Sequence, residues 1–411
     1  MLSALRTGLY SFLLLAGLGH AGVVKNHGAL KVQGNRIVDA SGNPIQLAGM
    51  SLYWSVWGGE KYFTAGVVGT MANQWSSSLI RAPAGVISGG GQNVYTYPGT
   101  ENLIKTVVDA AIANDIYVIV DWHLESGDPD QVEATQFFND MTSKYKNTPN
   151  IIWEIWNEPK TVAWSAIKTY ADAMIPLIRK NSSNLIIVGT PNWSHNPDQV
   201  LAAPITVDPN VAYTLHFYAN QNSNGNIDAD NNSAMAAADK AIKTLPLFIT
   251  EWGTVGNSGG GPVNTVWSDK WLAWAKTNGV SWANWSLCAQ SETSAALKAG
   301  ASTNGGWTDA NLTESGLYIK GKIAQVVPST SALEHRPLAT FSARRTSRDL
   351  DITLPRDARR LSIFDLRGNR VFQQTLSGQD HFVVPSAGSS TLMVRVETSG
   401  SGLVARLAPV R

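Results

Sequence analysis

Short apolar runs recur along the chain at a nearly constant interval, and this spacing restricts the fold more than any other feature. The runs start roughly 26 to 38 residues apart, the length of one strand, one crossover helix and two loops. Their hydrophobicity is continuous rather than alternating, as expected for strands buried on both faces. Eight such units predict an α/β fold, a (β/α)₈ barrel. The predicted strands are Ile45 to Gly49, Ser78 to Pro83, Ile116 to His123, Ile151 to Asn157, Leu185 to Thr190, Val211 to Tyr218, Leu247 to Glu251 and Val280 to Ser286.

The segments between these runs carry apolar residues at helical spacing, which predicts the crossover helices. A doubly wound open sheet is the alternative, but it would normally show a Gly-rich phosphate loop after its first strand, and the sequence has none. Ahead of the first strand, Leu30 to Val38 contains Gly34-Asn35 between apolar residues and predicts a short hairpin at the barrel bottom. The clearest predicted helices are Asn102 to Asn114, Trp164 to Arg179, Thr265 to Thr277 and, last, Thr313 to Val327.

The first residues have the pattern of a secretory signal. Arg6 gives a positive start, Leu9 to Leu18 is apolar, and Gly19-His20-Ala21 resembles a cleavage site with small residues. The apolar run is too short to span a bilayer, and no later segment approaches about 20 continuous apolar residues. Residues 1–21 therefore predict export, with a secreted, cell-surface or periplasmic product; a buried N-terminal helix is the alternative.

The composition divides the rest of the chain into a domain at 22–328, a linker at 329–340 and a β-rich module at 341–411. Residues 23–328 hold 19 Lys and Arg against 24 Asp and Glu, whereas 329–411 hold 12 against 7. Hydrophobic period two after residue 341 predicts a small all-β, sandwich-like module. It resembles the C-terminal sorting or terminal modules of secreted proteins from some Gram-negative bacteria, on the basis of Asp365-Leu366-Arg367-Gly368. Residues 329–411 are basic, but they lack clustered cations with interleaved aromatics, so nucleic-acid binding is not expected.

Two of the predicted strands end in a glutamate. One apolar run leads into Asn157-Glu158-Pro159, and another leads into Glu251-Trp252-Gly253. In a (β/α)₈ barrel the carboxyl ends of the strands face the active site. Hydrolysis of a glycosidic bond needs a pair of carboxylates in different roles, and these two strands would supply it. Other polar residues at predicted strand ends are Arg81, His123, Asn157, His216 and Tyr218.

The two glutamates are expected to differ in charge. Two nearby carboxylates repel, which raises the pKa of one, while an adjacent Arg keeps the other ionised. Arg81 is the expected partner of the ionised group, and Tyr218 could donate a hydrogen bond to it. This reasoning makes Glu158 the acid/base and Glu251 the nucleophile.

The other carboxylates are expected to support the structure, and some of the tryptophans are expected to contact sugar. Glu154 is expected to be a structural carboxylate bonded to barrel cations, and Asp121 and Asp128 are expected to shape loops. No group of His, Cys, Asp or Glu has convincing metal-ligand spacing, so neither a metal nor another cofactor is expected. Flat indole rings stack on the apolar face of a pyranose, and the Trp residues predicted to contact sugar are Trp54, Trp193 and Trp285.

At seven places in order, the chain resembles glycoside hydrolase family 5 (clan A), in particular its bacterial endo-β-1,4-glucanases. The resemblance covers roughly Gly28 to Val327. It implies a retaining mechanism on a β-glucan substrate, with Glu158 as acid/base and Glu251 as nucleophile. It also implies that Asn157 contacts the sugar 2-hydroxyl and that Arg81, His123, His216, Tyr218 and Trp285 build the cleavage subsite. The motifs are Ala48-Gly49-Met50-Ser51, Ile80-Arg81-Ala82-Pro83, Val120-Asp121-Trp122-His123, Trp156-Asn157-Glu158-Pro159, Leu215-His216-Phe217-Tyr218, Phe248-Ile249-Thr250-Glu251-Trp252-Gly253 and Ser281-Trp282-Ala283-Asn284-Trp285-Ser286-Leu287.

One motif departs from the family pattern. After the eighth strand, similar cellulases often read Ser-Asp-Lys, whereas this chain reads Leu287-Cys288-Ala289-Gln290. Gln290 is predicted to contact substrate in place of the lysine, without its charge. A mannanase, xylanase or mixed-linkage glucanase on the same scaffold stays open, as does a non-hydrolytic polysaccharide-binding surface protein. The sequence makes no prediction of the oligomeric state.

Overall fold

The computed structural model describes residues 22–86, 100–326 and 328, and seven short stretches between residues 342 and 407. The chain divides into two compact units, Met1–Thr330 and Ser331–Arg411. The predicted signal (1–21) and the predicted linker (329–340) lie outside the described residues. None of the helices in the described part is long and apolar enough to cross a membrane.

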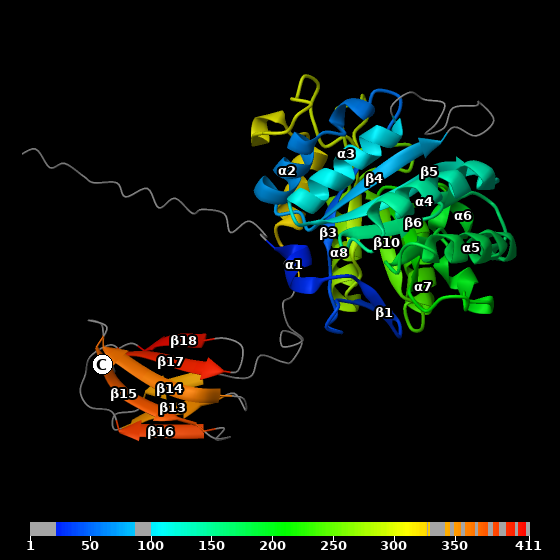
Figure 1. The fold of residues 1–411 in the computed structure, drawn as a ribbon. Helices are drawn as coiled ribbons and strands as arrows, with labels where there is room; N and C mark the ends of the chain where they lie inside the picture. Colours follow the sequence, from blue (N-terminus) through cyan, green and yellow to red (C-terminus); the bar gives the residue numbers. More distant parts are fainter. Residues whose placement is uncertain are drawn as a thin grey trace, which may run out of the picture. The chain divides into compact units, whose positions relative to one another are not determined.

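Eight parallel strands close into a barrel in the first unit (Figure 1). Each strand pairs with its neighbours in chain order, and the ring closes where the last strand, β11, pairs with the first, β3. This closure confirms the predicted (β/α)₈ barrel and excludes the open sheet. The barrel strands are β3 (Ala48–Leu52), β4 (Leu79–Val86), β5 (Tyr117–Ser126), β6 (Ile151–Glu154), β8 (Ile186–Val188), β9 (Val211–Tyr218), β10 (Leu247–Gly253) and β11 (Trp282–Leu287).

Helices cover the outside of the barrel strands (Figure 1). Helix α5 spans Trp164–Arg179 as predicted, and its buried positions, from Ile167 to Ile178, recur at helical spacing against the strands. The α-helices are α1 (Val23–His27), α2 (Ala65–Gln74), α3 (Thr100–Ala113), α4 (Gln131–Tyr145), α5, α6 (Pro191–Ser194), α7 (Ile227–Ala241), α8 (Thr265–Asn278) and α9 (Glu314–Ile323). Short 3₁₀ turns are η1 (Glu60–Tyr62), η2 (Pro197–Ala202) and η3 (Asp309–Asn311).

Most predicted strand ends differ from the observed ones by one to three residues, and for two strands the difference has a clear physical reason. The first was expected at Ile45 to Gly49, but β3 begins at Ala48, because Ile45 and Leu47 pack into the core at the barrel bottom. The fourth was expected to run without interruption from Ile151 to Asn157. Its ladder instead stops at Glu154 and resumes as a two-residue strand, β7 (Glu158–Pro159), which pairs with the end of β5.

The N-terminal hairpin closes the bottom of the barrel, as predicted. Strands β1 (Lys31–Gln33) and β2 (Arg36–Val38) pair antiparallel around Gly34, whose φ of 63° suits a residue without a side chain. Leu30 and Ile37, at the two ends of the hairpin, join one apolar cluster with side chains from the starts of the barrel strands. The open end of the barrel is therefore the opposite one, where the strands finish.

The described stretches of the second unit are all β, as predicted. Three strands form one antiparallel sheet and four form another. Both sheets contribute to one core, for example Ile352 and Val384 from the first with Ile363 and Val394 from the second, so the unit is a sandwich. Residues 366–368 of the motif that suggested a sorting module lie outside the described residues. The strands are β12 (Ser342–Arg345), β13 (Asp349–Thr353), β14 (Ala358–Asp365), β15 (Arg370–Thr375), β16 (His381–Pro385), β17 (Leu392–Thr398) and β18 (Gly402–Leu407).

Candidate active site

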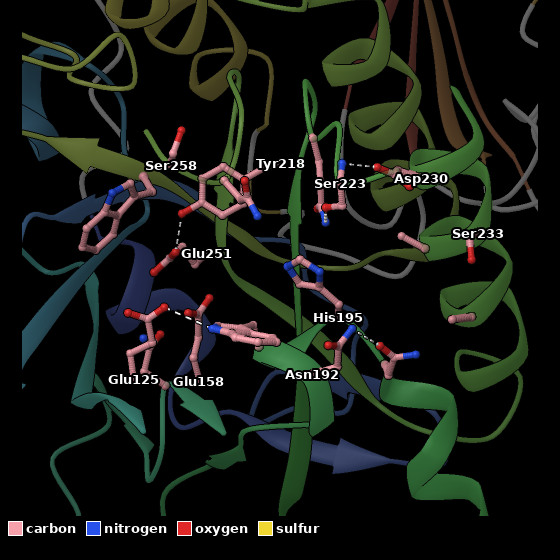
Figure 2. Close-up of a pocket in the computed structure, with 18 of the residues that line it drawn as sticks. Glu125, Glu158, Asn192, His195, Tyr218, Ser223, Asp230, Ser233, Glu251 and Ser258 are labelled. Atoms are coloured by element: carbon pink, nitrogen blue, oxygen red, sulfur yellow. Dashed lines mark hydrogen bonds between the residues drawn. The ribbon is translucent and has the colours of Figure 1, made fainter. Parts of the chain in front are cut away.

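A cleft of about 1120 Å³ lies at the carboxyl ends of the barrel strands. Both glutamates predicted to be catalytic, Glu158 and Glu251, line it and face each other across it (Figure 2). The other predicted residues that line it are Trp54, His123, Asn157, Trp193, Tyr218 and Trp285. The structure thus brings together in one cavity side chains that are spread over more than two hundred residues of sequence.

The two carboxyl groups are close enough to act on one bond. One oxygen of Glu158, one oxygen of Glu251 and one ring nitrogen of His216 all lie within 4.8 Å of one another. Retaining glycosidases place their carboxyl groups about 5–5.5 Å apart, and inverting ones about 6.5–9.5 Å apart. Two oxygens within 4.8 Å are closer than the inverting spacing, so the arrangement favours the retaining class.

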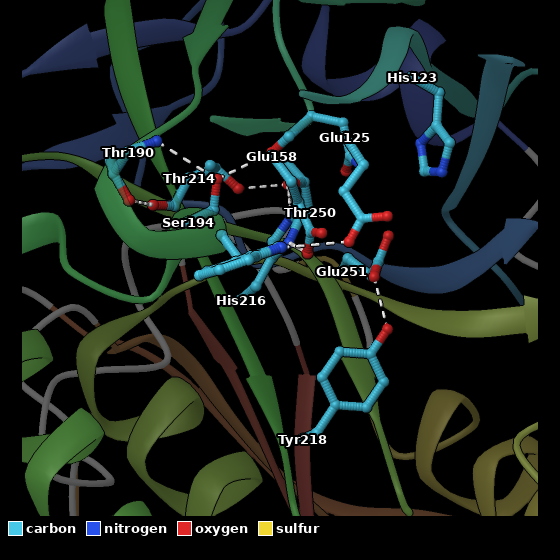
Figure 3. A network of polar contacts seen from close by, with 12 residues as sticks. His123, Glu125, Glu158, Thr190, Ser194, Thr214, His216, Tyr218, Thr250 and Glu251 are labelled. Atoms are coloured by element: carbon cyan, nitrogen blue, oxygen red, sulfur yellow. Dashed lines mark hydrogen bonds and ion pairs between the residues drawn. The ribbon is translucent and has the colours of Figure 1, made fainter. Parts of the chain in front are cut away.

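Two donors fix the carboxylate of Glu251. Arg81 Nη1 donates to Glu251 Oε2 at 2.9 Å. The Tyr218 hydroxyl donates to Glu251 Oε1 at 2.5 Å, a bond drawn in Figure 3. Gly253 makes the second contact possible, because a Cβ there would lie 2.4 Å from Cδ1 of the Tyr218 ring. Charge-assisted hydrogen bonds of this kind stabilise the negative charge and fix its direction. Both carboxylate oxygens of Glu251 are consequently fixed in direction.

Arg81 itself is fully buried and lies below the floor of the cleft. Its Nε donates to Glu154 at 2.7 Å, and its Nη2 contacts Asp121 at 2.9 Å. Glu154 is therefore a structural carboxylate, as the sequence indicated. The expectation that Asp121 shapes a loop is wrong: its Oδ2 also lies 2.6 Å from His123 Nδ1, inside the barrel. Burial raises the pKa of Asp121 and of Glu154 to about 7, against the opposing effect of the Arg81 charge.

Asn157 connects this buried cluster to the cleft. Its side-chain oxygen accepts from Arg81 Nη2 at 2.6 Å, which leaves its NH₂ group as the donor on the cleft side. The main chain at the same residue is anchored twice. The Asn157 amide donates to Trp122 O at 3.1 Å, and the Ser194 hydroxyl donates to Asn157 O at 2.8 Å. Glu158, which follows directly, thus projects from a fixed backbone.

The side chain of Glu158 contacts an imidazole, whereas that of Glu251 contacts a guanidinium. Glu158 Oε1 lies 2.8 Å from His216 Nδ1 rather than beside a permanent cation. Burial, followed by the negative charges of Glu251 and Glu125, raises the pKa of Glu158 well above its ordinary value. A carboxyl group in this position holds its proton at a pH where an exposed glutamate has lost it.

His216 is held as a neutral ring. Burial and the nearby positive charge of Arg81 lower its pKa well below its ordinary value. Its Nε2 lies 3.0 Å from the Thr250 hydroxyl, which in turn bonds the hydroxyl of Thr214 (Figure 3). The imidazole is thus fixed at both nitrogens, by Glu158 at Nδ1 and by Thr250 at Nε2. Its role here is to hold Glu158 in place.

Aromatic rings form one wall of the cleft. Trp285 stacks on His123, with ring centroids 5.2 Å apart and planes 6° apart, and Trp54 meets His123 edge-on at 4.2 Å. Tyr53 packs against Trp285 at 5.3 Å. These rings offer a sugar the flat apolar faces that pyranoses stack on. Trp193 reaches the cleft from the α6 segment.

Three predicted site residues do not line the cleft. Arg81 and His216 are fully buried and act through Glu251 and Glu158. The side-chain nitrogen of Gln290 donates a hydrogen bond to Trp57 O at 2.7 Å, and its contact with substrate stays a prediction. Its hydrogen bond to main chain is typical of a residue that shapes a loop.

Several residues that line the cleft were missed by the sequence analysis. Glu125 had a usable signal, because it continues the alternation of Asp121 and His123 along one strand and so points to the same side. Tyr53 directly follows the end of β3, where polar and aromatic groups gather. The others come from segments without periodic pattern, where side-chain direction is set by tertiary contacts. The missed residues include Tyr53, Glu125, Asn192, His195 and Glu292.

Glu158, His216 and Glu251 together also offer three ligand atoms that a metal ion could use. Each of the three already has a protein partner, however, and the guanidinium of Arg81 contacts Glu251 directly. A positive charge at that distance opposes binding of a cation. The arrangement fits an acid and a nucleophile better than a metal centre.

Comparisons with known proteins agree with this geometry. Residues 38–291 match the family model described as Cellulase (glycosyl hydrolase family 5). Endoglucanase Z of Dickeya dadantii (strain 3937) is 43% identical over 329 residues, which cover 78% of this chain and 73% of that protein. An endoglucanase of Clostridium saccharobutylicum is 39% identical over 305 residues, covering 72% of this chain and 65% of that protein.

Solved structures show the same likeness. The catalytic domain of Thermobifida fusca endoglucanase Cel5A superposes with a TM-score of 0.67 at 29% identity, over 74% of this chain and 99% of that domain. A cellulase named Cel5C_n gives a TM-score of 0.67 at 35% identity, over 76% of this chain and 97% of its own. With its closed barrel, its paired glutamates and these matches, the chain belongs to glycosyl hydrolase family 5, the cellulase family, and is a glycoside hydrolase.

Proposed function

We propose that this protein is a retaining endo-β-1,4-glucanase that cuts internal bonds of cellulose and soluble β-glucans. The observation that carries the proposal is the contrast between the two close carboxyl groups. Glu251 accepts hydrogen bonds from a guanidinium and a phenol, whereas Glu158 is buried beside a neutral imidazole and two negative charges. The first arrangement favours an anionic nucleophile and the second favours a protonated acid.

The chemistry then proceeds in two displacements. Glu251 attacks the anomeric carbon while Glu158 donates its proton to the departing glycosidic oxygen, giving a glycosyl–enzyme ester. Glu158, now a carboxylate, removes a proton from water, and that water breaks the ester. Arg81 and Tyr218 orient the attacking carboxylate of Glu251. The side-chain NH₂ group of Asn157 faces the sugar from the floor of the cleft. Two inversions return the β configuration.

The names of the relatives support the choice of substrate. The two similar proteins described above are endoglucanases, and the superposed structures are an endoglucanase domain and a cellulase. The open cleft, with aromatic rings along one wall, suits a long chain that enters sideways rather than a chain end in a closed pocket.

Two measurements test the proposal. Proton NMR during hydrolysis of a soluble cello-oligosaccharide should show the β anomer first, and an initial α anomer would exclude retention. A panel of carboxymethylcellulose, lichenan, xylan and mannan should show the highest kcat/KM on a β-1,4-glucan. Preference for xylan or mannan would assign the site to another polysaccharide, and activity on none would leave only a binding role.

We also propose that residues 1–21 direct export, so that the enzyme works outside the cytoplasm. The support is the sequence pattern alone: a positive start, an apolar run and small residues at 19 and 21. Expression of the full chain in a Gram-negative host should place activity in the periplasm or medium. Activity that stays in the cytoplasm of the host would overturn this proposal.

A further inference from the structure

Glu125 is a cleft residue that the reaction described above does not use. It lies near the end of β5, where the ladder to β7 sets Glu125 directly opposite Glu158. Figure 2 shows the two side chains next to each other below Glu251. Unlike the two reacting carboxyls, Glu125 is exposed.

Glu125 also contacts the ring of Trp193. The indole Nε1 of Trp193 donates to Glu125 Oε1 at 3.1 Å. The backbone that presents this ring is unusual: Asn192, Trp193 and Ser194 have φ values of 57°, 54° and 59°. A left-handed conformation costs roughly 1–2 kcal/mol per non-glycine residue, so three in a row persist only where other contacts impose them.

Contacts to the acid/base segment impose this conformation. The Asn192 amide donates to Lys160 O at 2.8 Å, and the Ser194 hydroxyl donates to Asn157 O at 2.8 Å. The α6 segment is thereby tied to the residues on either side of Glu158. The half-buried Trp193 side chain extends from this anchored backbone into the cleft, and its hydrogen bond to Glu125 fixes the far edge of the ring.

The charges around Glu158 come from several strands. Glu251 lies on β10, Arg81 on β4, His216 and Tyr218 on β9, and Asp121 and Glu125 on β5. Arg81 is engaged with Glu154, Asp121 and Glu251, and His216 is neutral. After burial and Glu251, Glu125 is the next influence that raises the pKa of Glu158.

We propose that Glu125 is a positioning residue with two effects: it holds the Trp193 indole at the side of the cleft next to the acid/base, and it places a negative charge beside the Glu158 carboxyl. The proposal deepens the glycosidase function and rests on it. A sugar leaving the site would pass between the proton donor and the indole that Glu125 fixes.

Two substitutions at Glu125 separate these effects. Glu125→Gln removes the charge but keeps an oxygen that can accept from Trp193 Nε1, whereas Glu125→Ala removes both. Trp193→Phe keeps a ring and removes the donor. Glu314→Gln is the matched control, because it removes one exposed carboxylate from the outer helix α9. Thermal unfolding of each variant checks that the fold is unchanged.

The readouts are the pH profile of kcat/KM and the KM on cellotetraose. The alkaline limb of kcat/KM reports the pKa of the acid in the free enzyme. Without the neighbouring negative charge that pKa falls, so in Glu125→Gln and Glu125→Ala the limb should move to lower pH by about 0.5 to 1 unit. KM should rise several-fold in Glu125→Ala and Trp193→Phe but stay near wild type in Glu125→Gln. Glu314→Gln should change neither quantity.

The outcomes distinguish this proposal from the function it rests on. If the alkaline limb of kcat/KM in Glu125→Gln stays at the wild-type pH, the electrostatic effect is overturned. If KM is equal in Glu125→Gln and Glu125→Ala, the positioning of Trp193 is overturned. If the wild-type enzyme fails to hydrolyse cellotetraose, the proposed function fails first. If Glu125 had only a structural role, its substitution would change Tm without moving the alkaline limb of the kcat/KM profile.

Discussion

The two ends of the barrel interior are built from the same strands, but one end buries apolar side chains and the other buries ionisable ones. At the bottom, Leu79, Tyr117 and Leu185 pack with the hairpin in one apolar cluster. At the top, the same strands supply Arg81, Asp121 and their partners, which are equally buried but ionisable. Burial of apolar surface stabilises the fold, whereas burial of charge costs stability unless the charges are paired. The barrel therefore separates a stabilising end from a reactive end.

The largest expected effect is on the reactive end. Glu251→Ala removes the nucleophile and should lower kcat/KM on carboxymethylcellulose by at least about 10³-fold. Its Tm should not fall, because a buried acidic group is lost from a cluster in which carboxylates outnumber the guanidinium. Activity assays and calorimetry on the same preparation check both statements. A variant that unfolds would show that the cluster supports the fold as well.

The stabilising end should behave in the opposite way. Leu185→Ala should lower the free energy of unfolding by about 2–5 kcal/mol, because Leu185 is fully buried at the barrel bottom. The kcat of the folded fraction should stay within a few-fold of wild type. Urea unfolding measures the loss, and Leu317→Ala on the exposed face of α9 is the matched control, with little expected change. Equal losses at both positions would contradict the account of the core.

A smaller effect is expected where glycine makes room for the site. In Gly253→Ala the new methyl group would collide with the Tyr218 ring and break its hydrogen bond to Glu251. A hydrogen bond to a charged group contributes about 1.5–3 kcal/mol, so kcat should fall by about tenfold to 150-fold. Tyr218→Phe should lose a similar amount, and the double variant little more. Additive losses would show that the glycine acts elsewhere.

The pH dependence of stability is expected to reflect the buried carboxyl of Asp121. Burial raises the pKa of Asp121 to about 7, so the folded state binds a proton that the unfolded state has released. The contribution of Asp121 is therefore present below about pH 4 and is lost as pH rises through 7. Three histidines with lowered pKa values, His123, His195 and His216, act with the opposite sign, so the comparison needs Asp121→Asn.

The free energy of unfolding, measured by urea at pH 4 to 7, should decline in wild type relative to Asp121→Asn by on the order of 1 kcal/mol per pH unit. Parallel curves for the two proteins would show that Asp121 does not titrate in this range.

Much of the fold could be predicted because its pattern is local. Strand β9 and helix α5 have the predicted ends, since each is one uninterrupted apolar pattern with its own period. The break after Glu154 could not be seen in this way. Continuous hydrophobicity hides it, and it arises because Asn157 turns to bond Trp122 and Ser194, residues distant in sequence.

The site shows the same limit. The two glutamates, Arg81 and Tyr218 stand at strand ends, so the barrel topology alone places them together. Asp121 was misassigned because its partner Arg81 lies 40 residues earlier and is met only inside the closed barrel. Gln290 was expected to face substrate, and its hydrogen bond to a main-chain oxygen of Trp57 was not predicted. That polar residues gather at the carboxyl end of the barrel could be predicted from sequence, whereas the partners that their side chains find there could not.

Azide rescue tests the assignment of the two glutamates most directly. On an aryl β-cellobioside whose leaving group needs no proton, Glu158→Ala with added azide should regain turnover and release the β-glycosyl azide, formed by attack on the glycosyl–enzyme ester. Glu251→Ala with azide should release the α-glycosyl azide, because azide then replaces the nucleophile in a single inversion. The α product from Glu158→Ala, or the β product from Glu251→Ala, would contradict the assigned roles.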